Sequence, residues 1–561
     1  MSPLGSLGRL LRSVRHLQRR QAVAQLRHVV GSAAVRPAAL AGPAPKLRLE
    51  ASSVPFLLPA SHLACEARAG DEISIRLLAR EVVFRGGVDW ESERTLFAYH
   101  LHHFEYARDP ALSPEARLAL LLEWIENHER GVGWDPDPLS HRIFAWGKML
   151  LTPGSLQPGE EQGAALLFSL ATQVETLSRN LEVRLQANHL FTNLAAVVFG
   201  GLLLEASGAE RWRAHAQGLR AELRNQIHSD GAHEERSPMY HCLLLEQVLD
   251  LLNLVRAVRL PGLEGLAAEL HDTASRMCGA LGVWTHPDGE IALFSDSAFD
   301  IAASPSALFA YASALGVSAQ APQSPDRLDG GGYVRLADDR WHLITSVGGP
   351  APVHQPGHAH CDALAFELSF SGQRIVTDTG VFEYAPGVAR DTARATRSHA
   401  TLEIDGREQA ETWAAHRVGG RPRVGVVDFQ PGRSLEASCC SWSTPEVVHH
   451  RRFELSDGGL QIHDRLQGRR ATVRFALPLA PGLEARLTGE PGGPRELRVA
   501  LSDAELRVDL PAATEGEWRL EPRDYFPSFG RRERRWCLTG SSQRFEAGTW
   551  RFRVVDEAGP S

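Results

Sequence analysis

The sequence predicts a protein with two large domains, a helical domain followed by an antiparallel β-sandwich. Through much of residues 86–320, apolar residues recur at helix spacing. Beyond about residue 325 they alternate with polar ones, and turn sequences such as Ser456-Asp457-Gly458-Gly459 separate the runs. With 561 residues, 43% of them apolar, the chain can bury more than one core. We therefore predict a basic, irregular region over 1–85, a helical domain over 86–320 and a sandwich over 325–561.

The region before residue 85 differs from the rest in charge. No acidic residue occurs before Glu50, whereas six arginines alternate with Leu and Val up to Arg27. No compact apolar core follows them, as it would in a secretory signal, and no apolar run approaches the roughly 20 residues of a membrane span. The pattern favours a basic amphipathic helix or arm packed on the body over a membrane-surface helix or a transit-like segment. On this ground the sequence predicts a cytoplasmic protein.

Six segments of the helical zone have apolar residues at helix spacing. Short connections join them, which is typical of antiparallel helix pairs, so either a bundle or a toroid of helix hairpins is possible. The segments are residues 116–127, 162–185, 190–205, 209–227, 239–258 and 263–281.

Two polar features stand at the expected starts of helices. Asn188 and His189 precede a strongly apolar stretch and could donate into a cleft, although a capping role for Asn188 is the simpler explanation. Ser237-Pro238 is typical of an N-cap and first helical residue, which places Tyr240 in the first turn. The helix dipole and Arg236 would favour the phenolate there. Tyr240 is thus a candidate general base or acid, or a packed tyrosine that bonds a loop.

Five alternating runs in the last zone predict strands. No helix of ordinary length is predicted among them, so an antiparallel sandwich is the natural arrangement. The runs are residues 341–347, 364–370, 401–404, 452–455 and 472–476.

The stretch from His354 to Trp413 concentrates imidazoles and carboxylates among strand-like runs. If the backbone around His360 is extended, alternate residues there share one face. Two imidazoles and a carboxylate suit a zinc ion, and a buried His–Asp hydrogen-bond network is the alternative. The candidates are His358, His360, Asp362, Asp378 and His399.

Three arginines follow Tyr384 in a Thr- and Ala-rich segment that we predict to be a loop. Arg390, Arg394 and Arg397 can bind carboxylates or sulfates through paired hydrogen bonds, or they can form a solvated charged loop. The predicted substrate contacts are His189, Arg236, Arg394 and Arg397.

Six segments, in this order, resemble the heparinase II/III family of polysaccharide lyases. They are VDWESERTLFAYHLHHFEYA, WDPDPLSHRIFAW, ANHLFTNLAAVVFGG, DGAHEERSPMYHCLLLEQVLDLLNL, GHAHCDALAFELSFSGQRIVTDTGVFEY and RATRSHATLEIDGREQAETW. The resemblance runs from about Asp89 to Trp413. It implies an incomplete α/α toroid followed by an antiparallel β-sandwich.

The resemblance also implies a reaction, the β-elimination of a uronate-containing polysaccharide. In that reaction the C6 carboxylate is neutralised, the C5 proton is removed and the C4 oxygen is expelled. By position, Asn188 matches the residue that holds the carboxylate, Tyr240 the catalytic tyrosine and His358 the catalytic histidine. The family's structural zinc ligands match His360, Asp378 and His399.

Three functions therefore compete. A lyase acting on an acidic polysaccharide comes first, because every group that it requires is present. A glycan-binding or polysaccharide-assembly protein without turnover is the second, since no export signal is recognisable although the resemblance implies a protein of the cell envelope or periplasm. A zinc hydrolase using His358, His360 and Asp378 is the third. A net charge of −8 gives no case for nucleic acid binding.

Overall fold

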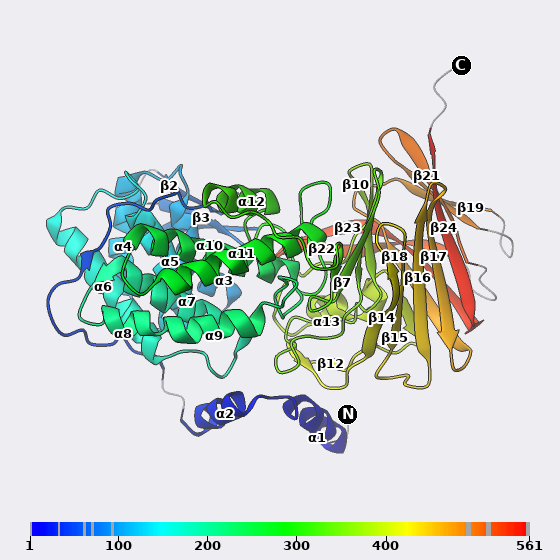
Figure 1. The fold of residues 1–561 in the computed structure, drawn as a ribbon, viewed down its shortest axis with the longest axis horizontal. Coiled ribbons are helices and arrows are strands. Elements are labelled where there is room, and N and C mark those ends of the chain that lie inside the picture. The colour runs from blue at the N-terminus through cyan, green and yellow to red at the C-terminus, as the bar shows by residue number, and fades with distance from the viewer. Residues whose placement is uncertain are drawn as a thin grey trace.

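A helical half and a sheet half lie side by side in the molecule (Figure 1). The computed structural model describes residues 3–31, 34–59, 63–68, 72–90, 95–489, 495–511 and 518–556. The predicted order, a helical domain followed by an antiparallel sandwich, is confirmed. Among the described residues, no helix is both long enough and apolar enough to cross a membrane.

The helical half contains ten α-helices and two short 3₁₀ helices within its described residues. They are α3 (Leu96–His103), η1 (Glu105–Arg108), α4 (Pro114–Asn127), η2 (Val132–Trp134), α5 (Pro136–Leu150), α6 (Glu160–Arg179), α7 (Ala187–Leu203), α8 (Ala209–Ala214), α9 (Ala216–Gln226), α10 (Pro238–Val258), α11 (Glu264–Trp284) and α12 (Pro305–Ala314). Each of the six predicted segments corresponds to one helix or, for 209–227, to the pair α8 and α9.

Three of these helices begin with the same Ser-Pro signal. In α4, α10 and α12 a serine side chain accepts a hydrogen bond from the backbone amide three residues further on. A proline follows as the first helical residue, where its missing N–H leaves no donor unsatisfied. The prediction that Ser237 and Pro238 start α10 is thus confirmed, and it fixes Tyr240 in the first turn.

The described part of the sheet half contains three larger antiparallel sheets and a two-stranded one of β12 (Thr412–Trp413) and β13 (Arg417–Val418). The strand orders of the larger sheets are β10-β9-β8-β7-β6, β11-β18-β23-β22 and β14-β15-β16-β17-β24-β21-β20-β19. The strands are β6 (Arg327–Leu328), β7 (Tyr333–Ala337), β8 (Trp341–Ser346), β9 (Phe366–Phe370), β10 (Gln373–Val376), β11 (Leu402–Ile404), β14 (Arg423–Gln430), β15 (Ser434–Cys440), β16 (Val448–Ser456), β17 (Gly459–Gln467), β18 (Ala471–Pro478), β19 (Ala485–Thr488), β20 (Glu496–Ala500), β21 (Ala504–Asp509), β22 (Arg519–Ser528), β23 (Arg531–Phe545) and β24 (Ala547–Asp556).

The first 85 residues are more regular than predicted. They contain α1 (Pro3–Val14) and α2 (Arg19–Gly31) and a three-stranded sheet of β2 (Ala64–Arg68), β3 (Glu72–Leu77) and β4 (Arg80–Arg85). Strand β1 (Lys46–Leu47) pairs with β5 (Leu204–Glu205) in the helical half. The prediction of an irregular region was wrong for these elements, whereas α1 and α2 match the favoured alternative, a basic helix packed on the body.

Each half has its own apolar core. The helical core is built around large buried rings such as Trp146 and Phe199, and the sandwich core around Phe366, Phe453 and similar residues. Val381 and Phe529 of the sheet half belong to the helical core. The two halves are therefore joined by packed apolar surface, and the functional groups described below lie at this junction.

Candidate active site

A cavity of about 590 Å³ lies between the helical half and the sheet half. Its helical wall includes Asn188, His189 and Tyr240. Across from these, the sheet half contributes His358, Tyr384, His416 and Phe529. The three residues that sequence reasoning assigned to catalysis, Asn188, Tyr240 and His358, thus line one cavity although they are far apart along the chain.

Asn188 enters the cavity from the first turn of α7. Its side-chain amide donates to both carboxylate oxygens of Glu235, at 2.7 and 2.9 Å, and its backbone amide donates to one of them at 3.1 Å. Burial opposes the charge of Glu235, but His358, His233 and these hydrogen bonds outweigh it and lower the pKa of that carboxyl. Asn188 therefore faces a carboxylate already within the protein, and it is not the N-cap, which is Gln186.

Tyr240 stands between the helical wall and the sheet half. Its hydroxyl lies 2.9 Å from the Tyr384 hydroxyl, and its ring centroid lies 4.1 Å from that of His358. Burial, reinforced by the carboxylates of Glu235 and Asp296, raises the pKa of Tyr240 well above its ordinary value.

The predicted phenolate at Tyr240 was therefore wrong. Arg236, expected to favour it, turns away and donates to the carbonyls of Gly330 at 3.1 Å and Gly349 at 2.8 Å. With Arg236 bonded elsewhere, burial decides the protonation state and Tyr240 is a neutral phenol.

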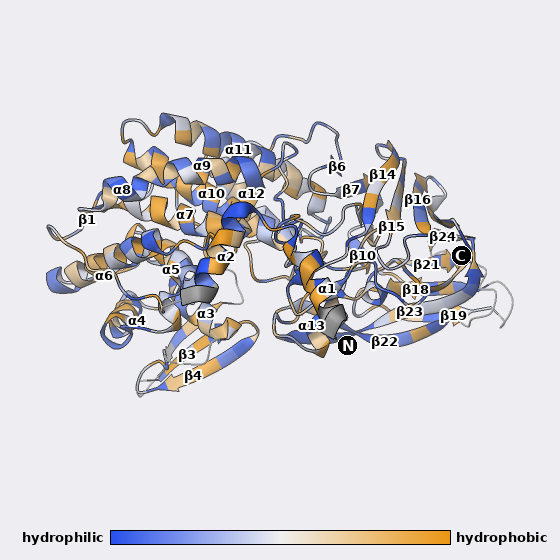
Figure 2. Ribbon diagram, turned by 90° about the horizontal axis from the view of Figure 1, so that it is seen from below, coloured by the Kyte–Doolittle hydropathy of each residue, from blue (hydrophilic) through white to orange (hydrophobic). Residues whose placement is uncertain are grey.

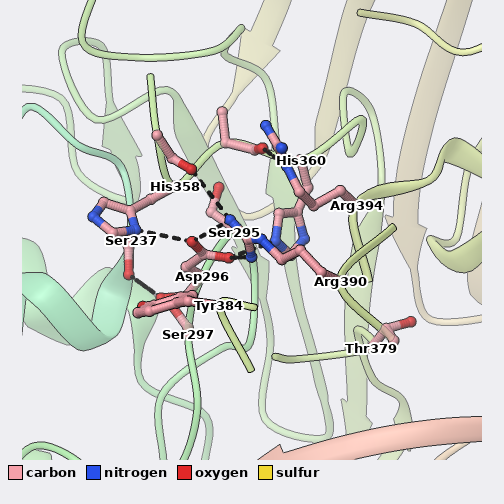
Figure 3. Close-up of polar contacts among 12 residues, drawn as sticks. Ser237, Ser295, Asp296, Ser297, His358, His360, Thr379, Tyr384, Arg390 and Arg394 are labelled. Atoms are coloured by element: carbon pink, nitrogen blue, oxygen red, sulfur yellow. Dashed lines mark hydrogen bonds and ion pairs between the residues drawn. The ribbon is translucent and has the colours of Figure 1, made fainter. Parts of the chain in front are cut away.

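His358 is held from behind by Asp296, as Figure 3 shows. Its Nδ1 lies 2.9 Å from one oxygen of the fully buried Asp296 carboxylate, and its Nε2 lies 3.9 Å from Glu235. A carboxylate can only accept, so Nδ1 carries the proton in this contact and Nε2 is left to face the cavity.

The Asp296 carboxylate also contacts two further side chains. The His360 Nε2 lies 2.8 Å from its other oxygen, and the buried Arg390 guanidinium contacts both oxygens. Burial opposes the charge of Asp296, but Arg390 and the two histidines outweigh it and hold its pKa well below the ordinary value. Arg390 lies in α13 (Val388–Arg394), so the predicted loop is partly helical and this arginine is not solvated.

A possible metal-binding group lies just behind this network. The ligand atoms of His360, Asp378 and His399 lie within 4.8 Å of one another, and all three residues are buried. The His399 Nδ1 lies 2.9 Å from Asp378, whereas the buried His360 Nδ1 and His399 Nε2 have no hydrogen-bond partner. Two orphaned imidazole nitrogens beside a carboxylate fit a cation.

Asp362 does not join this group, although the sequence placed it on a shared face. The stretch 357–362 begins with a turn and is otherwise irregular, so the strand alternation that predicted a shared face is absent. Asp362 instead accepts a hydrogen bond from the backbone amide of Ser295 at 3.3 Å.

Of the four predicted substrate contacts, only His189 lines the cavity. Its Nδ1 lies 3.3 Å from Glu182. Burial opposes the imidazolium, but Glu182 outweighs it and raises the pKa of His189 to about 9. This histidine therefore offers a cationic group to the cavity.

The other three arginines do not line the cavity. Arg236 donates to the two glycine carbonyls described above. The buried guanidinium of Arg394 donates to the carbonyls of Ala359 at 3.1 Å and Ala415 at 2.9 Å. Arg397 is exposed on the 3₁₀ helix η3 (Thr396–Ser398). Backbone carbonyls thus bind Arg236 and Arg394, because a guanidinium donates to a carbonyl as well as to an anion, whereas the exposed Arg397 stays a predicted contact outside the cavity.

Four residues of the site were not predicted as such: Glu235, Asp296, Tyr384 and His416. Glu235 and Tyr384 adjoin motifs that the sequence singled out. Asp296 and His416 have no sequence signal, since their neighbours in space come from other elements.

Comparisons with known proteins place these observations in a family. The model described as Heparinase II/III N-terminus matches residues 128–315, and the model described as Heparinase II/III-like, C-terminal, matches residues 320–549. A heparin-sulfate lyase of Pedobacter heparinus is 27% identical over 251 residues, which is 41% of this chain and 38% of that enzyme. The matched part is therefore well under two thirds of the relative's length.

Solved structures agree with the fold at low sequence identity. A crystal structure of heparinase III superimposes with a TM-score of 0.65 and 18% identity, covering 85% of this chain and 80% of that one. The heparan sulfate lyase HepC from Pedobacter heparinus gives a TM-score of 0.56 and 18% identity, covering 86% and 81%. The predicted architecture, an incomplete helical toroid followed by a β-sandwich, is thus confirmed.

Proposed function

This chain belongs to the heparinase II/III family, and from that premise we propose that it is a polysaccharide lyase acting on a uronate-containing polysaccharide by β-elimination. One observation carries the proposal. Asn188 and Tyr240 of the toroid and His358 of the sandwich converge on one cavity, with the two rings 4.1 Å apart. Such a convergence supplies the carboxylate binder, the acid and the base that elimination requires.

Asn188 and His189 neutralise the carboxylate of the bound uronate. The C5 proton is weakly acidic until charge on the adjacent carboxylate is stabilised. The Asn188 amide donates to both oxygens of Glu235 in this structure, so one of these two contacts has to be released for Asn188 to donate to the substrate carboxylate. His189 adds a positive charge on the same wall, because its pKa is raised to about 9.

The proton transfers are divided between His358 and Tyr240. His358 Nε2 takes the C5 proton, and the electrons of the C5–H bond form the C4=C5 double bond. The C4–O bond breaks as the neutral Tyr240 phenol, in hydrogen-bond contact with Tyr384, gives its proton to the departing oxygen. Asp296 stabilises the imidazolium that forms on His358 and keeps the ring in position.

The assignment is tested by ultraviolet absorbance, which detects the unsaturated uronate product. Purified protein is incubated with heparin, heparan sulfate, hyaluronan, chondroitin and alginate. We expect absorbance to rise with at least one polymer, and Tyr240→Phe to reduce that rate by about 10² to 10⁴, since it removes one acid–base group.

Tyr106→Phe is the matched control. The Tyr106 hydroxyl is buried without a hydrogen-bond partner and lies outside the cavity, so its loss should leave the rate unchanged. Near-normal activity of Tyr240→Phe would refute its role as the acid. Binding without product across the whole panel would favour the second function, an acidic-glycan-binding protein.

We propose further that His360, Asp378 and His399 hold a structural divalent cation. Two imidazoles and one carboxylate suit zinc, which when bound would orient His360 and stiffen the sandwich side of the site. Because His358 is not in this group and the three candidate ligands are buried, the zinc hydrolase is disfavoured.

Metal analysis of purified protein tests this part independently of activity. We expect about one equivalent of zinc per chain by mass spectrometry, retained in Tyr240→Phe and lost in His399→Ala. Chelation should lower the melting temperature of the wild type and leave that of His399→Ala unchanged. A wild type that contains no divalent metal and does not respond to added zinc would refute the site.

A further inference from the structure

Helix α1 is docked on the protein with its polar face inward. Residues Arg9, Arg12 and Ser13 face the sandwich, whereas the apolar residues Leu7, Leu10, Leu11 and Val14 are exposed. The exposed set has the i, i+3, i+4, i+7 spacing of one helical stripe. An amphipathic helix on a soluble body ordinarily buries that stripe, so the orientation of α1 is the reverse of the usual one.

Specific polar contacts hold α1 in this orientation. The Arg12 guanidinium donates to both oxygens of Glu411, at 2.8 and 2.6 Å, and the Trp413 indole donates to the Ser13 hydroxyl at 3.0 Å. Arg12 also lies over the Trp442 ring, 5.6 Å from its centroid. Because these contacts fix the polar face, the leucines are left outward.

Helix α2 continues the same outer face over the toroid. Arg20 pairs with Glu222 at 2.9 Å and Gln21 is buried, whereas Val23 and Leu26 are exposed by 50% and 66%. Six of the fifteen exposed large apolar side chains in the described part of the chain lie between Leu7 and Leu26. Both helices lie in front of the two domains when the molecule is seen from below (Figure 2).

The outer face is also cationic. No acidic residue precedes Glu50, and the ion-paired arginines Arg9, Arg12 and Arg20 use Glu411 and Glu222 of the body as partners. Arg15, Arg19 and Arg27 are exposed beside the apolar residues. Apolar side chains flanked by positive charges suit a partner that has an apolar interior beneath a negatively charged boundary.

We propose that α1 and α2 form a docking surface for an anionic phospholipid bilayer. The apolar residues Leu7, Leu10, Leu11, Val14, Val23 and Leu26 would enter the headgroup region, and the exposed arginines would contact lipid phosphates. A second copy of the chain is a poorer occupant, since a symmetric dimer through this face would oppose one arginine-rich surface with another. This inference does not depend on the lyase activity.

Vesicle flotation with the full chain tests the proposal. We expect the wild type to float with phosphatidylcholine vesicles that contain phosphatidylglycerol, and not with phosphatidylcholine alone. Leu7→Glu with Leu11→Glu should reduce the bound fraction at least tenfold, since each leucine contributes about tenfold by burial. Arg19→Glu with Arg27→Glu should reduce it by a similar factor, about tenfold, on anionic vesicles.

Val83→Glu with Val427→Glu is the matched control, because both valines are exposed elsewhere on the surface. It should float like the wild type, and circular dichroism should show all variants folded. The proposal is overturned if the wild type does not float with anionic vesicles, or if Leu7→Glu with Leu11→Glu floats equally well. A wild-type dimer in sedimentation, abolished by the same substitutions and with no vesicle binding, would identify a second copy as the occupant instead.

Discussion

Two adjacent glutamates at the candidate active site differ in how their surroundings shift their pKa values. Glu235 is charged, because His358 and Asn188 compensate its burial. For Glu234, burial together with the negative charges of Glu235 and Glu222 outweighs Arg20 and raises its pKa to about 8, although His354 also lies 4.0 Å away. The charged Glu235 carboxylate thus favours the protonated form of its neighbour Glu234.

Replacing Glu234 with Gln should make the protein more stable at alkaline pH. Since the folded-state pKa of Glu234 lies above the ordinary value, the folded protein binds a proton that the unfolded chain releases. Stability is therefore lost as pH rises from about 4.5 to about 8. In Glu234→Gln this loss disappears. In urea unfolding, the difference in free energy of unfolding between the variant and the wild type should therefore be more favourable to the variant at pH 8.5 than at pH 4.5, by about 2–4 kcal/mol. The exposed Glu126→Gln should show none, and an unchanged pH dependence in Glu234→Gln would contradict the assignment.

Individual site residues could be predicted only where a family motif carried them. Asn188, Tyr240 and His358 were assigned through the resemblance, and all three line the cavity. Physical reasoning about the charge state of Tyr240 failed, because burial by the sheet half is a property of tertiary structure. Asp296 could not be found at all, since its partners come from segments 62 to 94 residues away in sequence.

At the scale of elements, the toroid depends on close helix contacts at glycines. A Cβ added at Gly200 of α7 would lie 2.3 Å from the Val174 Cγ2 of α6, and one at Gly147 of α5 would lie 2.4 Å from the Phe199 ring. Val174 and Phe199 are fully buried and cannot move aside. Small residues at these points let α5, α6 and α7 approach and so position Asn188 at the start of α7.

Gly200→Ala should destabilise the protein, whereas Gly282→Ala should stabilise it. The first substitution overpacks the contact with Val174, for which about 1–3 kcal/mol is expected. Gly282 lies within α11, and a Cβ there meets no atom within 4 Å among the described residues. An alanine there should add about 0.5–1 kcal/mol through helix propensity. Thermal and urea unfolding of both variants measure this, and equal effects would contradict the packing argument.

The predicted elements include strands with one buried face, such as β16, and elements buried on all sides, such as α7 and β9, whose apolar runs are nearly continuous. The six predicted helices and five predicted strands all occur. Helix α5 was missed because buried polar residues such as Arg142 and Lys148 lie among its apolar residues. A helix without a polar face has no helical alternation of apolar and polar residues, and its buried charges interrupt the apolar pattern.

For the whole molecule, the junction of toroid and sandwich is both the candidate active site and a structural connection. Asp296 lies in the loop between α11 and α12, and its carboxylate contacts His358, His360 and Arg390 of the sheet half. Its backbone carbonyl accepts a hydrogen bond from Ser237, the N-cap of α10. One buried residue thereby links the helix that presents Tyr240 to the loop that presents His358.

Asp296→Asn should therefore weaken the fold as well as the activity. Arg390 is fully buried, and without its counter-charge the guanidinium would be left uncompensated, for which a loss of about 3–5 kcal/mol is expected. Removing the charge as well, in Asp296→Asn with Arg390→Met, should recover part of that loss, since no charge is then buried alone. The exposed pair Asp509 and Arg553 provides the control, and Asp509→Asn should cost less than about 1 kcal/mol. Urea unfolding measures all three variants. A loss below about 1 kcal/mol in Asp296→Asn would show that the junction is held by its apolar contacts alone, because a compensated buried charge cannot be removed so cheaply.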